Sequence, residues 1–144
     1  MRFAYGPFGT PGDAAYVVEG DRIYQACGPF GERGTCLWLF SEDKVFHVAD
    51  GFGTKGAGAF LMDGKGFHRA EGAFANKGSC LFSLEGNKVV RSEGPFCTPT
   101  SSGFVLEQGL VFRGEGPFMN KSDAVLRVDG EIPMIALLTL LVAQ

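Results

Sequence analysis

Histidine and cysteine, two side chains often used for acid–base and nucleophilic chemistry, are scarce in this 144-residue chain, which has two histidines and four cysteines. An enzyme would rely first on His47 and on Cys97, since Cys97 directly follows a loop phenylalanine, where a thiol is accessible. The spacing of the histidines does not form a histidine–carboxylate–nucleophile triad. A cysteine- or histidine-dependent enzyme is therefore the minor hypothesis, and the sequence favours a non-enzymatic protein.

Metal and cofactor sites have no sequence signature either. Zinc sites use Cys or His ligands at short spacings, and the chain has no Cys-x-x-Cys or His-x-x-x-His motif, so we predict neither a metal nor a cofactor. His68 falls in a column of buried aromatic positions and is interpreted as a core residue. Cys27, Cys36, Cys80 and Cys97 fall in three repeat columns, which argues against a disulfide framework. A bond between Cys27 and Cys36, which flank one short loop, is left open.

Four cations recur three residues after phenylalanine positions: Arg33, Lys55, Lys77 and Lys121. Their position in predicted long loops places them together at one rim of the molecule, with the carboxylates of the tight turns at the opposite rim. A basic rim is suited to anionic ligands such as lipid headgroups. The alternative interpretation is that these are ordinary solvated loop residues.

A second charged set lies on the predicted second strands of the hairpins. Its arginines are Arg69, Arg91 and Arg113, and each is followed two positions later by a glutamate. Residues two apart point to the same face of a strand, so this face is predicted to be solvated and to hold cross-strand ion pairs. It is also a candidate docking face for a partner.

A repeat with a fixed period of 22 residues must position all of these side chains. The phenylalanines that mark it are Phe8, Phe30, Phe52, Phe74, Phe96 and Phe118. Six residues after each of them the side chain is small, and eight residues after it the side chain is large. A period of this size indicates an array of one supersecondary unit. The length of the chain suits one repeat domain over residues 1–144.

Each unit has the pattern of a β-hairpin. In the first unit Gly-Pro-Phe opens a loop, and Glu19-Gly20-Asp21 is a tight-turn signal between two β-rich runs, residues 14–18 and 23–27. Alternation along the strands then assigns the faces. The small and large positions of the first strand, and the second-strand column that begins with Tyr24, are predicted to line one common interior.

The sixth unit lacks a second strand, because Pro133 cannot donate to a strand ladder. Residues 1–6 match the missing strand in register and are predicted to pair with residues 124–128. The predicted fold is an all-β, closed, up-and-down antiparallel barrel of about twelve strands over residues 1–131. Such a barrel is too wide for its own side chains to fill. The run 132–144 is apolar on every face, which predicts a buried helix inside the barrel.

The combination of twelve antiparallel strands and a hydrophobic C-terminal helix resembles the tubby, LURP and phospholipid-scramblase superfamily. That resemblance implies a barrel threaded by its helix and, by analogy, attachment to anionic lipid. Residues 64–74 (Gly-Lys-Gly-Phe-His-Arg-Ala-Glu-Gly-Ala-Phe) are instead similar to MORN repeats. This second resemblance implies an open sheet of stacked hairpins.

Composition limits the partners. The net charge of −3 and a pI near 5.3 lack the basic footprint of a nucleic-acid-binding protein, so no nucleic acid is expected. The C-terminal apolar run is shorter than the roughly 20 residues of a transmembrane helix, and no signal peptide is visible. We therefore expect a cytoplasmic binding or structural module, whose partner is an unidentified protein or an anionic lipid headgroup at the membrane surface.

Overall fold

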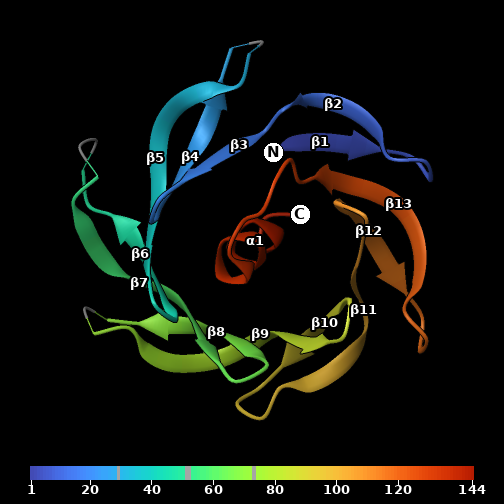
Figure 1. Cartoon of the computed structure of the whole chain (residues 1–144). Helices are drawn as coiled ribbons and strands as arrows, with labels where there is room; N and C mark the ends of the chain where they lie inside the picture. The colour runs from blue at the N-terminus through green and yellow to red at the C-terminus, as the bar shows by residue number, and fades with distance from the viewer. Residues whose placement is uncertain (29, 51–52, 73) are drawn as a thin grey trace.

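The computed structural model describes residues 1–28, 30–50, 53–72 and 74–144. These residues form antiparallel β-strands that stand in a ring around one short helix, α1 (Met134–Leu141) (Figure 1). The strands are β1 (Arg2–Tyr5), β2 (Thr10–Ala14), β3 (Tyr16–Glu19), β4 (Arg22–Cys27), β5 (Glu32–Ser41), β6 (Lys44–Val48), β7 (Lys55–Asp63), β8 (Gly66–Glu71), β9 (Asn76–Glu85), β10 (Lys88–Glu93), β11 (Thr98–Glu107), β12 (Leu110–Glu115) and β13 (Asn120–Arg127).

The order of strands in the sheet follows the chain, which confirms an all-β, up-and-down antiparallel arrangement. From β3 to β13 each strand pairs with its neighbours in sequence. The N-terminal strand β1 then pairs with β13, where Arg2 lies opposite Arg127 and Phe3 opposite Leu126. As predicted, β1 takes the place of the second strand that the last unit lacks.

Closure of the sheet differs from the prediction. The ladder ends at β2 and at β3, which are not paired with each other, so strand pairing leaves the 13-stranded sheet open. The count exceeds twelve because the first strand of unit 1 is divided at Ala15 into β2 and β3. The N–H of Ala15 donates to Met1 O at 2.9 Å, and its carbonyl accepts from Ala26 N at 3.0 Å.

Two kinds of turn connect the strands. In several tight turns the residue with positive φ is a glycine, such as Gly20 at 58°, because glycine adopts this conformation without strain. The Gly-Pro-Phe turns are closed by a backbone bond, as from Gly9 N to Gly6 O at 3.3 Å. They are shorter than predicted. Residues expected in long loops belong to strands instead, and β5 begins at Glu32, two positions after Phe30.

A register shift changes the predicted faces. In unit 2 Cys36 pairs with Tyr24 whereas Trp38 pairs with Ile23, so Leu37 is an extra residue on β5. Tyr24 and Ile23 are consecutive and point to opposite faces, and their partners must do the same. The prediction that the small and large columns share one interior is therefore wrong. The large column faces α1, and the small column faces outward.

The apolar side chains form two layers. The inner layer surrounds α1 and includes the rings of Phe60, Phe67 and Phe82, whose successive centroids lie 5.3 and 6.3 Å apart. A second, outer cluster contains Phe112 and Ala124. The second-strand column that begins with Tyr24 belongs to this outer side, which corrects its predicted place in the interior.

The turns that begin at Gly6, Gly72 and Gly94 cover the outer side, because each of these turns bends over the preceding unit. Equivalent backbone bonds fix them there: Gly58 N to Gly72 O at 3.0 Å, Cys80 N to Gly94 O at 2.9 Å, and Ala124 N to Gly6 O at 2.9 Å. The last of these bonds joins the final unit to the first. The inner face of the sheet thus packs against α1, and part of its outer face packs against these turns.

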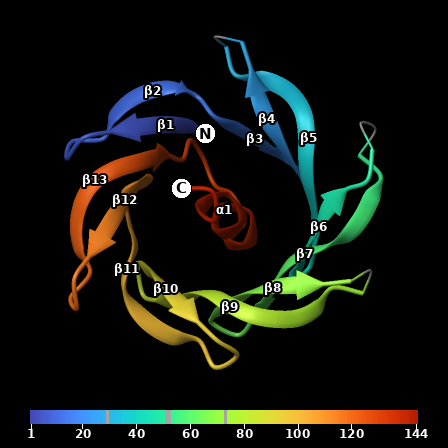
Figure 2. The ribbon, with the colours of Figure 1, turned by 180° about the vertical axis from the view of Figure 1, so that it is seen from behind.

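The helix α1 is shorter than the predicted run 132–144. It begins at Met134, directly after Pro133, and its residues from Ile135 to Leu141 are all buried. A helix that is apolar on every side is stable only when it is surrounded, and Figure 2 shows the strands enclosing α1 from behind as well. In the part of the chain that the structure describes, no helix is long and apolar enough to cross a membrane.

Candidate functional site

The four predicted cations lie on strands rather than in loops. Three of them pair with carboxylates of the preceding unit: Arg33 Nη1 with Glu19 Oε2 at 3.0 Å, Lys77 Nζ with Asp63 Oδ2 at 3.0 Å, and Lys121 Nζ with Glu107 Oε2 at 3.3 Å. The predicted separation into a basic and an acidic rim is wrong. The bent hairpins bring the cations beside the tight-turn carboxylates, so opposite charges meet on the outer wall.

Three of the four cations also lie over aromatic rings of the outer column. The contacts to the ring centres are Arg33 over Tyr24 at 4.8 Å, Lys55 over Phe46 at 4.6 Å, and Lys121 over Phe112 at 4.6 Å. In the unit that precedes Lys55 the carboxylate position is Ser41. The repeat therefore supplies no carboxylate at this position for Lys55.

The predicted docking arginines are not on the outer wall. Arg91 is two residues from Val89 on β10 and shares its inward face. Its guanidinium lies 5.1 Å from the centre of the Phe104 ring, and its Nη2 donates to Gln144 O at 3.1 Å. Arg69 and Arg113 occupy the same column and are exposed.

The C-terminal end of the chain explains how a charged side chain can face inward. Arg91 is half-buried and donates to Gln144 O, three residues beyond the end of α1 at Leu141. The other arginines of the column, Arg69 and Arg113, are exposed to solvent. The predicted cross-strand pairs of these arginines with Glu71, Glu93 and Glu115 are not among the ion pairs of the described residues.

The two residues of the enzyme hypothesis have different surroundings. His47 is exposed on β6, opposite Trp38 of β5. Cys97 is not a free thiol, because it forms a disulfide with Cys80. The nucleophile that the hypothesis requires is thus blocked in this state.

The disulfide corrects the prediction that no such bond is expected. Cys80 and Cys97 lie in different repeat columns, but the bent turn places Cys97 against the small column of the preceding unit, as it places Ala75 against Gly58. Cys27 and Cys36, for which a bond was left open, are both free.

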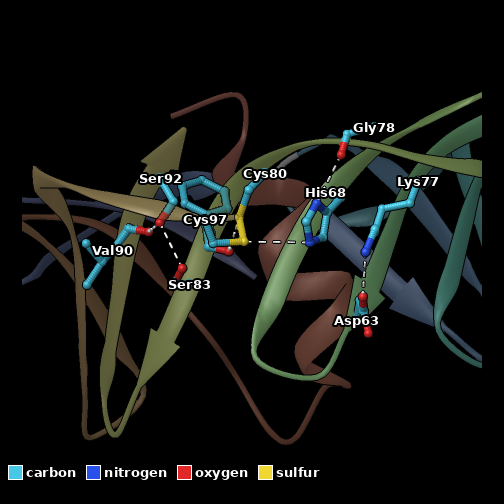
Figure 3. Close-up of a disulfide and its surroundings, with 10 residues drawn as sticks. Asp63, His68, Lys77, Gly78, Cys80, Ser83, Val90, Ser92 and Cys97 are labelled. Atoms are coloured by element: carbon cyan, nitrogen blue, oxygen red, sulfur yellow. Dashed lines mark hydrogen bonds and ion pairs between the residues drawn. A yellow bond between two sulfur atoms is a disulfide. The ribbon is translucent and has the colours of Figure 1, made fainter. Parts of the chain in front are cut away.

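A histidine completes a compact cluster at the disulfide (Figure 3). His68 of β8 is 3 % exposed, as is Cys80, so its predicted burial is confirmed. Its Nδ1 lies 3.1 Å from Gly78 O, and its Nε2 lies 3.6 Å from Cys97 Sγ. The ligand atoms of His68, Cys80 and Cys97 all lie within 4.8 Å of one another. Sequence reasoning missed this cluster because its members are 12 and 17 residues apart.

The marker phenylalanines themselves form the most exposed apolar set. Phe8, Phe30, Phe74, Phe96 and Phe118 are between 76 and 91 % exposed, and Phe52 lies outside the described residues. Scattered exposed apolar residues are normal on proteins. Here, however, equivalent turns present the same ring, and Figure 1 shows these turns directed outward around the periphery. The 22-residue period identified these phenylalanines in the sequence, but it did not show whether their side chains are buried or exposed.

Contacts to earlier units hold the turns in place. Lys44 Nζ donates to Phe74 O at 3.2 Å, and Lys88 Nζ donates to Phe118 O at 2.9 Å. The disulfide fixes the residue next to Phe96. The exposed rings are therefore carried by anchored backbone.

In one of the outer-wall ion pairs the pKa of the carboxyl group is shifted. The hydrogen bond and the charge of Lys77 hold the pKa of the Asp63 carboxyl below its ordinary value. The shift favours the ionised carboxylate at neutral pH. This pattern belongs to a structural ion pair, in contrast to a catalytic acid, whose pKa is typically raised.

Comparison with known proteins gives no match to a family model, to a curated protein or to a solved structure. The tubby-like resemblance therefore rests on architecture alone, and the MORN-like resemblance on residues 64–74 alone.

Proposed function

We propose that this protein is a non-enzymatic binding module that engages protein partners through the exposed marker phenylalanines of its turns. The observation that carries the proposal is the exposure of five equivalent rings on anchored turns. Burying one such ring contributes about 1.5–3 kcal/mol to association. Anchored turns lose little conformational entropy on binding, which further favours recognition.

The arrangement of the turns favours several copies of a folded partner over one flat surface. The turns are directed outward around the ring, so a flat bilayer can meet only some of them at once (Figure 1). The net charge of −3 also gives no general attraction to anionic lipid. A partner with a small apolar pocket can occupy each turn separately, and repeated occupancy gives a multivalent assembly.

Photo-crosslinking tests this proposal. A photoreactive phenylalanine analogue at position 30 or 118, in cells that naturally express the chain, should capture one and the same protein. The matched control is Tyr5, an aromatic residue that is 59 % exposed outside the marker column. Equal capture from position 5 would contradict a role specific to the turns.

Calorimetry with the purified partner then tests multivalency. We expect more than one partner per chain and a stepwise fall in stoichiometry when Phe30→Ser, Phe74→Ser and Phe118→Ser are combined. Each remaining turn should keep its affinity, and Tyr5→Ser should change nothing. A stoichiometry of one that survives all three substitutions would overturn the proposal.

Anionic-lipid binding through Arg33, Lys55, Lys77 and Lys121 is the alternative. Its support is the shared position of these cations on the outer wall, although three of them are paired with carboxylates. Co-sedimentation with phosphatidylcholine vesicles, with and without phosphatidylserine, separates the two functions. Salt-sensitive binding that is lost when the four residues are neutralised would support the lipid function and count against the protein partner.

Closure of the sheet and a cytoplasmic location are further parts of the proposal. The backbone bonds on both sides of Ala15 support a ring that is continuous at the seam between β2 and β3. A closed ring would present the turns in all directions without an exposed strand edge. Fractionation of cells that express the chain tests the location.

A further inference from the structure

Where the third, fourth and fifth units meet, several residues that lie close together depart from the repeat. Gly66 stands where the equivalent residues are Arg22, Lys44, Lys88 and Leu110. His68 stands where they are Tyr24, Phe46, Val90 and Phe112. Cys97 stands where they are Gly9, Gly31, Gly53, Ala75 and Met119. The other units fold without these residue types, so the fold itself does not require the cluster.

We propose that His68, Cys80 and Cys97 bind one Zn²⁺ when the Cys80–Cys97 disulfide is reduced. Two thiolates and one imidazole are ligands that Zn²⁺ prefers in proteins. The three ligand atoms already lie within 4.8 Å of one another on β8, on β9 and in the turn before β11. The site therefore forms from residues that the fold has brought together.

The orientation of His68 suits a metal ligand. Gly78 O, 3.1 Å from Nδ1, can only accept a hydrogen bond, so Nδ1 carries the proton. The lone pair is then on Nε2, which faces Cys97 Sγ at 3.6 Å. A backbone carbonyl that holds the second ring nitrogen is the usual support of a zinc-binding histidine.

The distances also agree with a zinc site. Bonds of about 2.3 Å to sulfur and 2.0 Å to nitrogen at tetrahedral angles place the ligand atoms roughly 3.5–3.8 Å apart. The nitrogen of His68 and the sulfur of Cys97 already have this separation. The two sulfur atoms reach it when their bond is broken, because they are then no longer held at covalent distance.

Gly66 leaves space beside the ligand atoms. A Cβ at this position would lie 2.8 Å from Cys97 Sγ and 2.9 Å from His68 Nε2. A larger residue would therefore press on both ligand atoms. The fourth coordination position is left to water or to a side chain of a partner, since Cys97 is only half-buried.

The oxidised and metal-bound states exclude each other. A dithiol reductant supplies two electrons and two protons, the sulfur–sulfur bond breaks, and two thiols form while the reductant becomes a disulfide. Zn²⁺ then displaces the two thiol protons, which are released to solvent. The cluster would thus alternate between a disulfide and a metal site according to the redox state of its surroundings.

Metal titration of the full chain tests the inference. The protein is reduced with a phosphine, freed of reductant without oxygen, and titrated with Zn²⁺ against a chromophoric chelator. We expect one Zn²⁺ per chain in the reduced form and no binding in the oxidised form. Co²⁺ should give thiolate-to-metal charge-transfer absorption, and bound Zn²⁺ should protect Cys80 and Cys97 from alkylation.

Single substitutions identify the ligands. Cys80→Ser, Cys97→Ser and His68→Gln should each weaken Zn²⁺ binding by more than tenfold, whereas Cys27→Ser and Cys36→Ser are matched controls that should leave it unchanged. Circular dichroism verifies that each variant folds; if one does not, alkylation protection in the wild-type chain decides. A reduced wild-type chain that binds no Zn²⁺, or one whose Zn²⁺ leaves both cysteines fully reactive, would overturn the proposal.

Discussion

At the scale of residues, the roles of charged side chains depend on their spatial neighbours. Arg33, Lys77 and Lys121 have carboxylate partners 14 positions earlier in the chain. Arg91 lies instead over inner rings and contacts the end of the chain. The same residue type therefore contributes to the outer wall in one place and to the interior in another.

The Asp63–Lys77 pair gives a prediction about pH. Because the pKa of Asp63 in the folded protein is below the unfolded value of about 3.9, the pair's contribution to stability is complete above that pH. It is lost as the pH falls through the folded pKa. Carboxyl ¹³C NMR should report a lowered pKa for Asp63, and Lys77→Met should raise it towards the ordinary value. An unchanged titration in Lys77→Met would show that Lys77 is not the cause.

At the scale of elements, the bulged hairpin and the buried helix define the architecture. The extra residue in the first strand allows each hairpin to pack inward against α1 and outward against the next turn. The turns add strain where the residue after the marker phenylalanine is not glycine, as at Ala75 with φ 51° and Met119 with φ 52°. Both side chains are buried, so packing offsets the strain.

A prediction concerns the helix. Leu138 is fully buried in the inner layer, whereas Met134 of the same helix is 41 % exposed. Leu138→Ala should lower the free energy of unfolding by about 2–5 kcal/mol, because it removes buried methyl groups and leaves a cavity. Met134→Ala is the control and should cost less than about 1 kcal/mol. Denaturant unfolding measures both, and equal losses would contradict the placement of α1 inside the ring.

At the scale of the whole molecule, the junction between the first and last units determines whether the ring is continuous. Ala124 donates to Gly6 O with the same repeat spacing as the internal junctions, and β1 pairs with β13. The remaining seam lies at Ala15. Its backbone groups are hydrogen-bonded on both sides, although β2 and β3 do not form a ladder.

Hydrogen exchange tests the seam. If the ring is continuous, the amide protons of Ala15 and Ala26 should exchange about as slowly as that of Cys80, which is bonded at an internal junction. NMR-detected exchange of the full chain provides this comparison, with the intrinsic rate of an unstructured amide as the fast reference. Exchange of Ala15 and Ala26 near that intrinsic rate would indicate an open sheet.

The repeat makes the local part of the fold predictable. Each 22-residue unit encodes a hairpin through alternation and turn residues, both of which act between near neighbours in sequence. The register of residues 1–6 predicted the pairing of the N-terminal strand, and the all-round apolar run predicted a buried helix. The helix α1 is shorter than the predicted run 132–144, because it begins only after Pro133 and ends at Leu141.

The sequence by itself determined the hairpins and the strand order, because these follow from periodicity, and it determined the identity of the buried helix, because that run is apolar on every side. Only the tertiary structure decided which face each column occupies. One extra residue, Leu37, moves the side chains that follow it to the opposite face of the sheet, and the composition of the strand does not show this change. The turns that bend over the preceding unit bring cations beside carboxylates and bring Cys80 beside Cys97 and His68. They also leave the marker phenylalanines exposed to solvent. Such contacts depend on how neighbouring units pack, which no single unit encodes.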